Sequence, residues 1–175
     1  MTDSTVLSIE TMALANTAAI VSIAAVNFDS NKPDGGSTEH FYTELDWMNQ
    51  GRRRDRSTWK YWMGQSDKAK SALKGKTKLG TALALLNEFI GHKTDIWALL
   101  PFDIPVLTTA YSQCNLKPPW GHWNLCDVRT IKRLYEMKRC GLSTSVTQGE
   151  TALEKALHKV DIICKGVDTL TDGAW

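Results

Sequence analysis

The sequence predicts an α/β domain in which helices flank a mixed sheet. Three segments with strand patterns come first, and later strands alternate with segments of helical periodicity. A chain of 175 residues with 42% hydrophobic and 23% charged residues has the length and composition of one globular domain. We therefore predict a single domain over residues 1–175.

The first half of the predicted sheet consists of neighbouring strands. Residues 5–9 are rich in β-branched and apolar side chains, which predicts a buried strand. Residues 18–28 predict a second strand after a short turn, and residues 40–45 alternate polar with apolar side chains, as a third strand does. The segment 29–36 is rich in Asn, Pro, Asp and Gly, which predicts the turn between the second and third strands.

The pattern then changes to helical periodicity. Ser57 or Thr58 is suited to cap a helix that carries Trp59, Trp62 and Met63 on one face. A second helix is predicted over residues 78–91. Its buried stripe is expected to consist of Leu79, Leu83, Leu86 and Ile90.

The remaining elements alternate between strand and helix. Residues 94–100 predict a strand, and residues 102–114 a helix with Pro105 in its first turn, where proline is tolerated. Residues 125–128 predict a short strand that leads into a helix ending near Met137. A last helix is predicted over residues 149–167. Its inward side chains are expected to be Leu153, Leu157, Val160 and Cys164.

Charge and cysteine content exclude several classes of protein. A net charge of +2 gives no overall electrostatic basis for binding nucleic acid, so such binding requires a local patch. The apolar N-terminal stretch is interrupted by Glu10 and Asn16, which predicts no membrane span. The four cysteines form no CxxC pair, as is typical of reduced thiols in a cytoplasmic protein. They are Cys114, Cys126, Cys140 and Cys164.

The segment VLSIETMA at residues 6–13, followed by the apolar residues 18–23, resembles the first motif of the DEDD (DnaQ-like) 3′–5′ exonucleases. The resemblance is to the phage and bacterial branch similar to T4-type exonuclease A. In that family the strand ends in Asp-x-Glu-Thr-Met, and both acids bind catalytic metal. The glutamate is present here as Glu10, whereas Ser8 stands at the aspartate position.

Three further landmarks of that branch follow in order. RSTWKYWMGQS at residues 56–66 resembles its Ser-Thr-x-x-Trp-Trp-x-x-Gln-Ser helix, and WNLCDVRT at residues 123–130 resembles its Trp-Asn-x-Arg-Asp-x-Arg-Thr segment. WALLPFDIPVL at residues 97–107 resembles the second motif, whose aspartate, here Asp103, is the third metal ligand. The resemblance implies a ribonuclease H-like mixed five-stranded sheet flanked by helices.

The third motif of the family is altered in this sequence. The family pattern is His-x-Ala-Leu-x-Asp-Ala, in which the histidine is the general base and the aspartate completes the metal site. The corresponding segment is ETALEKA at residues 150–156. Glu150 therefore stands at the histidine position and Lys155 at the aspartate position.

These substitutions predict a weakened metal site. Hydrolysis by two metal ions needs carboxylates that hold two dications roughly 4 Å apart. At the four ligand positions the formal charge changes from −4 to −1. We expect Lys155 to pair with Glu10 and Asp103, which would then hold at most one weakly bound ion; the alternative is that Lys155 points to solvent. No cofactor is expected, and any remaining activity would require Mg²⁺ or Mn²⁺.

A different set of residues offers an alternative catalytic group. Glu150, Glu154 and His158 are spaced four residues apart on the last predicted helix, so their side chains are expected on one face. A carboxylate with a raised pKa can accept a proton in place of the missing histidine. The alternative is that His158 is an ordinary surface residue.

The densest basic run, at residues 52–56, is a candidate nucleic-acid-binding segment. Its cations are suited to phosphates and the aromatic residues that follow are suited to stacking on bases. The alternative is a solvated loop before a helix whose tryptophans are buried. The candidate binding residues are Arg52, Arg53, Arg54 and Arg56.

The sequence thus favours a degenerate 3′–5′ exonuclease-like protein whose metal-dependent phosphodiesterase activity is impaired or absent, and which acts by binding. Two alternatives stay open: an active Mg²⁺-dependent exonuclease with a modified site, and a phage-type pseudo-nuclease that inhibits a host protein system. The expected partners are single-stranded nucleic acid, a host protein, or a second copy in a homodimer, with no membrane. A phage-encoded protein would act in the host cytoplasm.

Overall fold

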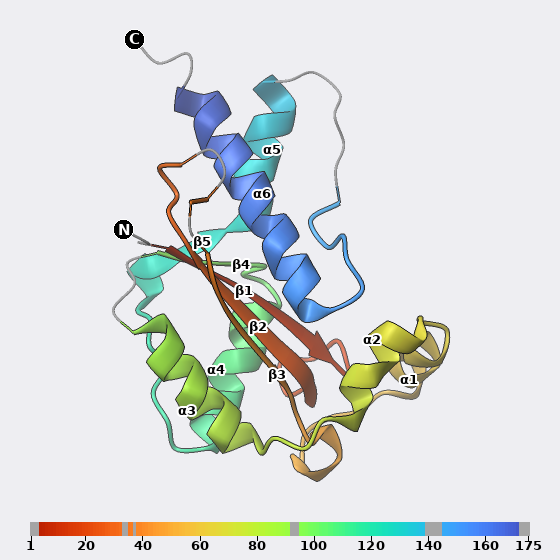
Figure 1. Cartoon of the computed structure of the whole chain (residues 1–175). Coiled ribbons are helices and arrows are strands. Elements are labelled where there is room, and N and C mark those ends of the chain that lie inside the picture. The colour runs from red at the N-terminus through yellow and green to blue at the C-terminus, as the bar shows by residue number, and fades with distance from the viewer. Residues whose placement is uncertain (1–3, 33–34, 37, 92–94, 139–144, 172–175) are drawn as a thin grey trace.

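Five strands form one mixed sheet in the computed structural model, which describes residues 4–32, 35–36, 38–91, 95–138 and 145–171 (Figure 1). The strand order is β3-β2-β1-β4-β5, with β1–β2 and β2–β3 antiparallel and β1–β4 and β4–β5 parallel. The predicted mixed five-stranded sheet is therefore confirmed. The strands are β1 (Ser4–Thr11), β2 (Ile20–Phe28), β3 (Glu39–Glu44), β4 (Asp95–Ala98) and β5 (Leu125–Asp127).

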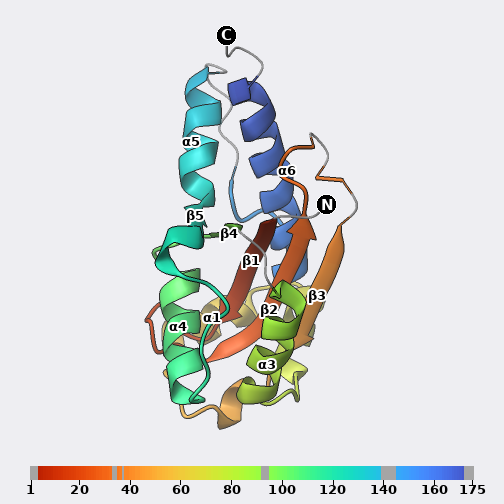
Figure 2. The same cartoon turned by 90° about the vertical axis from the view of Figure 1, so that its left-hand side faces the viewer.

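Helices cover both faces of the sheet (Figures 1 and 2). Successive strand side chains point to opposite faces, so Ile23 of β2 packs into the core beneath α3 and α4, while its neighbour Ala24 packs beneath α5 and α6. Burial on both faces explains why β2 is apolar along nearly its whole length. The helices are α1 (Arg56–Met63), α2 (Asp67–Ser71), α3 (Leu79–Ile90), α4 (Asp103–Gln113), α5 (Val128–Lys138) and α6 (Ala152–Thr171); the 3-10 turns are η1 (Trp47–Asn49), η2 (Ala72–Lys74) and η3 (His122–Asn124).

Two predicted helices match the structure closely. The α3 stripe of Leu79, Leu83, Leu86 and Ile90 is buried, and Pro105 lies in the first turn of α4. The predicted start of the fourth strand, Thr94, and Cys140 lie outside the described residues. None of the helices in the described ranges combines the length and apolar composition that crossing a membrane requires.

The prediction for α1 is wrong in two respects. The helix begins at Arg56 with Asp55 as its N-cap, so neither Ser57 nor Thr58 caps it. Only Trp62 is buried, because α1 lies at the end of the sheet and packs one side against the loop after β1. The indole Nε1 of Trp62 donates a hydrogen bond to the carbonyl oxygen of Thr11 at 3.0 Å. Trp59 and Met63 are 41% and 44% exposed.

The prediction for α6 needs correction at its start and on its buried face. Thr151 caps the helix: its hydroxyl accepts from the Glu154 amide, and the Glu154 carboxylate accepts from the Thr151 amide. The helix therefore begins at Ala152, three residues later than predicted. Leu157, which we expected to point inward, is 36% exposed, whereas the Lys159 side chain, for which we made no prediction, is 1% exposed. The short helix α2 was not predicted.

Candidate functional site

The end of β1 and the start of α4 bring the two remaining acids together beneath α6. Ser8 and Glu10 are two residues apart on β1, so both side chains point to the face that α6 covers. Asp103 is the first residue of α4 and is 2% exposed. Ser8 is also buried, at 3% exposure. The folding of the chain thus places the residues of the first two motifs near one another.

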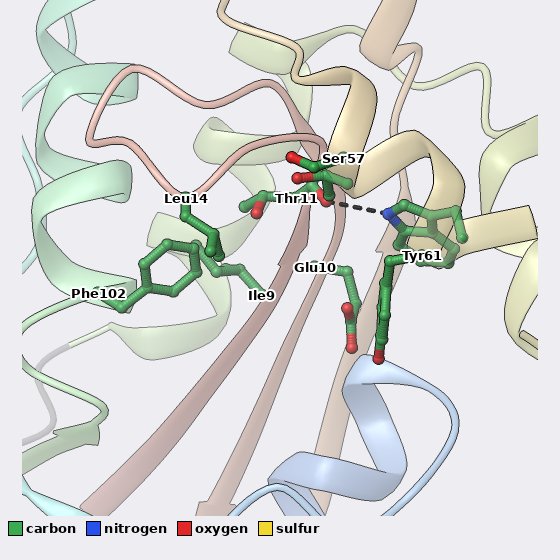
Figure 3. A pocket seen from close by; sticks show the side chains of 9 residues that line it. Ile9, Glu10, Thr11, Leu14, Ser57, Tyr61 and Phe102 are labelled. Carbon is green, nitrogen blue, oxygen red and sulfur yellow. Dashed lines mark hydrogen bonds between the residues drawn. The ribbon is translucent and has the colours of Figure 1, made fainter. Parts of the chain in front are cut away.

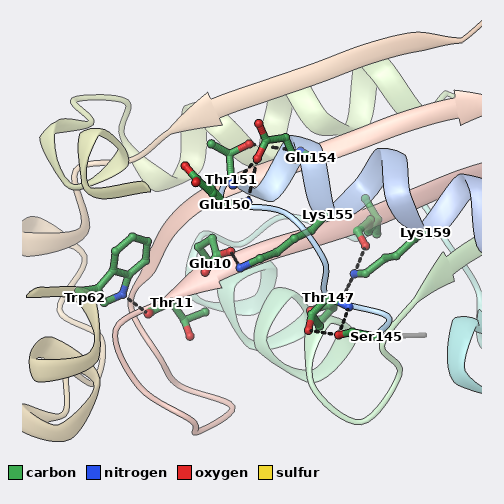
Figure 4. Close-up of polar contacts among 12 residues, drawn as sticks. Glu10, Thr11, Trp62, Ser145, Thr147, Glu150, Thr151, Glu154, Lys155 and Lys159 are labelled. Atoms are coloured by element: carbon green, nitrogen blue, oxygen red, sulfur yellow. Dashed lines mark hydrogen bonds and ion pairs between the residues drawn. The ribbon is translucent and has the colours of Figure 1, made fainter. Parts of the chain in front are cut away.

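Lys155 of α6 forms an ion pair with Glu10 (Figure 4). The two side chains are largely enclosed, with exposed fractions of 16% for Lys155 and 13% for Glu10. Lys155 therefore points into the site and not to solvent. The lysine at the altered third motif neutralises the acid of the first motif.

Asp103 is paired with a different lysine from the one we expected. Lys159 Nζ lies 3.0 Å from Asp103 Oδ2 and donates a second hydrogen bond to the Leu7 carbonyl oxygen at 2.9 Å. The same carboxylate oxygen accepts from the Leu99 amide at 3.1 Å. Because the Lys159 and Asp103 side chains are only 1% and 3% exposed, this is a fully buried ion pair.

The sequence contains a pattern that predicts a buried position for Lys159. Lys159 follows Ala152 and Ala156 at helical spacing, next to Val160 and before Ile163, and all of these are buried. A lysine inside an apolar helical stripe is either exposed at its tip or paired with a buried acid. Its four-residue spacing from Lys155 places both amino groups over the same side of the sheet.

The site does not fit a pair of divalent cations. The two acids, Glu10 and Asp103, carry two negative charges, and Lys155 and Lys159 carry two positive charges, so the four groups sum to zero. Each carboxylate that would ligate a metal is in contact with an ammonium group. Within the described part of the chain, no group of three or more His, Cys, Asp or Glu side chains is arranged to hold a metal ion.

Burial raises the pKa of Glu10 above its ordinary value of 4.5, against the attraction of Lys155, and the nearby Asp103 charge acts in the same direction as burial. The folded protein therefore keeps a proton on Glu10 at pH values where the unfolded chain has lost it. More protons bound in the folded state means that stability falls as pH rises through this range. The free energy of unfolding is therefore lower when Glu10 is ionised than when Glu10 is protonated.

We expect the free energy of unfolding of the wild type, measured relative to Glu10→Gln, to decrease as the pH rises above about 4.5. Urea unfolding of both proteins from pH 4 to pH 8 measures this difference. Glu154→Gln is the matched control, because contact with Lys68 lowers the pKa of Glu154 and the corresponding difference should increase with pH. A difference for Glu10 that is constant with pH would contradict the assigned shift.

The alternative catalytic residues are engaged away from the two buried ion pairs. Glu150 Oε2 accepts a hydrogen bond from Ser66 Oγ at 2.8 Å, and Glu154 pairs with Lys68 of α2. His158 Nε2 lies 2.7 Å from the Ser145 carbonyl oxygen. Glu150, at the position where the family has its histidine, is therefore part of a contact between α2 and the start of α6.

A pocket of about 430 Å³ opens beside Glu10 (Figure 3). Its rim carries two exposed side chains, Leu14 at 84% and Tyr61 at 55%. The Glu10 carboxylate and the Tyr61 hydroxyl point toward α6. The pocket is mostly apolar, which suits a planar organic group more than a hydrated ion. Its walls are Ile9, Glu10, Thr11, Leu14, Ser57, Thr58, Tyr61, Trp62 and Phe102.

The structure corrects the expectation for Arg52. This side chain is 8% exposed, and its guanidinium donates to the carbonyl oxygens of Ala18, Asn16 and Val106. A guanidinium whose donors are used inside the fold does not reach a phosphate in solvent. Arg52 therefore holds the segment before α1 in place. The other three candidates, Arg53, Arg54 and Arg56, are exposed.

Comparison with known proteins gives one family and one fold. Residues 3–166 match the family described as the 3′–5′ exoribonuclease Rv2179c-like domain. No curated protein matches the chain by sequence. Similar solved structures include Escherichia coli exonuclease I in complex with a dT13 oligonucleotide, with 15% identity and a TM-score of 0.66. That alignment covers 97% of this chain and 42% of the exonuclease I chain.

Two further structures of the same enzyme agree with this match. The complex with a dA16 oligonucleotide has 16% identity and a TM-score of 0.65, and covers 95% of this chain and 40% of the other. The zinc-bound form of the complex with single-stranded DNA has 13% identity and a TM-score of 0.62, and covers 97% and 41%. The chain thus spans less than half of the enzyme it resembles. At these identities the likeness shows the ribonuclease H-like exonuclease fold.

Proposed function

The chain belongs to the family of Rv2179c-like 3′–5′ exoribonuclease domains, and on this premise we propose that it is a degenerate member that binds nucleic acid without metal-dependent hydrolysis. The observation that carries the proposal is the pair of internal salt bridges, Lys155 with Glu10 and Lys159 with Asp103. Both acids that remain of the expected ligand set are neutralised within the protein.

Electrostatics supports this proposal. A dication that entered the site would meet two ammonium groups held close to its ligands. At about 4 Å and an effective dielectric constant of about 20, each unit charge repels another by roughly 4 kcal/mol, and a dication by more. Neither lysine can move away from its carboxylate without leaving a buried charge uncompensated, which is energetically costly. Binding two metal ions would therefore disrupt both the site and the fold around it.

The motif pattern supports a finer assignment. The order of the segments at residues 6–13, 56–66, 97–107 and 123–130 places the chain, in our proposal, near the phage and bacterial branch similar to T4-type exonuclease A. In this view the ligand changes at Ser8 and Lys155 arose on an intact fold. The Glu10 pocket and the exposed arginines before α1 are then the surfaces left for binding.

We expect the purified protein to release no mononucleotides from labelled single-stranded RNA or DNA in Mg²⁺ or Mn²⁺. Hydrolysis is measured on denaturing gels, and Mn²⁺ binding is measured in parallel by calorimetry. Glu10→Gln is the control for a contaminating nuclease, since hydrolysis that persists in this variant does not come from this site. Mn²⁺-stimulated hydrolysis that Glu10→Gln abolishes would overturn the proposal and favour the active-enzyme alternative.

A further inference from the structure

A second, shallower hollow lies next to the N-terminal end of α1, and we call it the aromatic–arginine notch. Its volume is about 240 Å³. Two tryptophans form part of its wall: the rings of Trp47 and Trp59 lie 6.0 Å apart between centroids, with their planes inclined by 37°. The notch is lined by Met12, Trp47, Arg54, Asp55, Arg56 and Trp59.

The backbone that carries the arginines of the notch is held rigidly. The Arg53 amide donates a hydrogen bond to the Thr17 carbonyl oxygen, and the Arg53 carbonyl oxygen accepts one from the Ala19 amide, each at 2.8 Å. The Asp55 amide bonds to the Met12 carbonyl at 2.8 Å. The buried Arg52 side chain adds its own hydrogen bonds from below. The segment is therefore organised before any ligand arrives, which reduces the entropic cost of binding.

The charges in the notch are not balanced by neighbouring acids. Asp55 is paired with Arg53, whose Nε lies 2.9 Å from the carboxylate. Arg54 and Arg56 have no ion-pair partner among the described residues, and both are exposed. The indole Nε1 of Trp47 donates to the Leu73 carbonyl at 3.0 Å, which fixes this ring, while Trp59 presents a 41% exposed ring to solvent.

We propose that the aromatic–arginine notch binds one base of a single-stranded nucleic acid, with the base on Trp59 and the flanking phosphates on Arg54 and Arg56. This inference rests on the proposed nucleic-acid binding and names the part of the surface that performs it. Stacking on tryptophan accepts any base, because every base has a π face, and arginine is suited to phosphate. The small volume suits a single ring system better than a larger ligand.

The two hollows lie along the same helix. Arg56 and Trp59 line the notch, whereas Ser57, Thr58 and Tyr61 line the Glu10 pocket. A strand that crosses α1 would therefore place one nucleotide in each hollow. The exposed Trp59 ring beside Arg54 and Arg56 favours a nucleic acid over a protein partner, because these arginines are suited to the phosphates that flank a stacked base.

We test the notch by fluorescence anisotropy with a labelled 12-nucleotide oligouridine in EDTA. We expect Trp59→Ala to weaken binding roughly tenfold and Trp59→Phe to retain most of it, because the smaller ring still stacks. Arg54→Ala with Arg56→Ala should weaken binding and reduce the slope of log affinity against log salt by about 1.4, since each lost phosphate contact contributes about 0.7.

The controls lie elsewhere on the molecule. Trp123→Ala removes a 76% exposed tryptophan in η3, and Arg133→Ala removes an exposed arginine of α5; neither should change the affinity. If Trp59→Ala bound as tightly as the wild type, the assignment of the notch would be wrong. If the wild type itself did not bind, both the assignment and the proposed nucleic-acid binding would be wrong, and a protein would become the alternative ligand of the notch. Because EDTA prevents metal-dependent hydrolysis, this outcome is independent of whether the protein cleaves.

Discussion

Replacement of Lys159 by methionine is expected to lower the free energy of unfolding by about 3–5 kcal/mol. Lys159 Nζ is the partner of Asp103 Oδ2 and of the Leu7 carbonyl oxygen, at 3.0 Å and 2.9 Å. Methionine fills a similar volume but donates no hydrogen bond. The Asp103 carboxylate would then stay buried without its cation, and among the described residues the Leu99 amide would be its remaining hydrogen-bond donor.

Urea unfolding followed by circular dichroism at neutral pH measures the loss. The double variant Lys159→Met with Asp103→Asn should recover most of it, because asparagine is neutral and keeps an acceptor for the Leu99 amide. Lys165→Met is the matched control on the same helix: its pair with Asp161 is 56% and 50% exposed and is expected to contribute less than about 1 kcal/mol. Equal losses for Lys159→Met and Lys165→Met would contradict a buried ion pair.

The fold could be predicted from the sequence because its strands and helices have local patterns of apolar and polar residues. The apolar run that became β2 reports burial on two faces, and the stripe that became α3 has the period of a helix packed on one side. The boundaries were less accessible. The start of α6 depends on the reciprocal hydrogen bonds between Thr151 and Glu154.

Only those residues of the candidate site that lie in a recognisable motif could be predicted from the sequence. The spacing of motifs led to Glu10, Asp103 and Lys155, but alignment of single positions could not reveal that Lys159, one turn further on, reaches Asp103. Burial of Arg52 was equally hidden, because its acceptors come from segments distant in sequence. Identical side chains in one basic run therefore have different roles, which depend on tertiary contacts.

Restoration of the family's ligands is expected to succeed only if Lys159 is also removed. The three-site variant carries Ser8→Asp, Glu150→His and Lys155→Asp; the four-site variant adds Lys159→Met. The second lysine would otherwise stay on Asp103 and repel a metal ion by about 4 kcal/mol or more, which corresponds to roughly a thousandfold in affinity. We expect Mn²⁺ to bind the four-site variant at least hundreds of times more tightly than the three-site variant.

The effect of Mn²⁺ on the melting temperature gives a second test of the four-site variant, with the wild type as its control. Without metal, the four-site variant holds four carboxylates close together and is expected to be less stable than the wild type, so Mn²⁺ should raise its melting temperature in a concentration-dependent way. The same titration should leave the melting temperature of the wild type unchanged, because Glu10 and Asp103 already have internal cations. Mn²⁺-dependent hydrolysis of single-stranded RNA should follow the same order. Equal Mn²⁺ affinity in the two variants would mean that Lys159 does not block the site. A folded four-site variant without Mn²⁺ affinity would contradict the proposal that the changes at these four positions prevent metal binding.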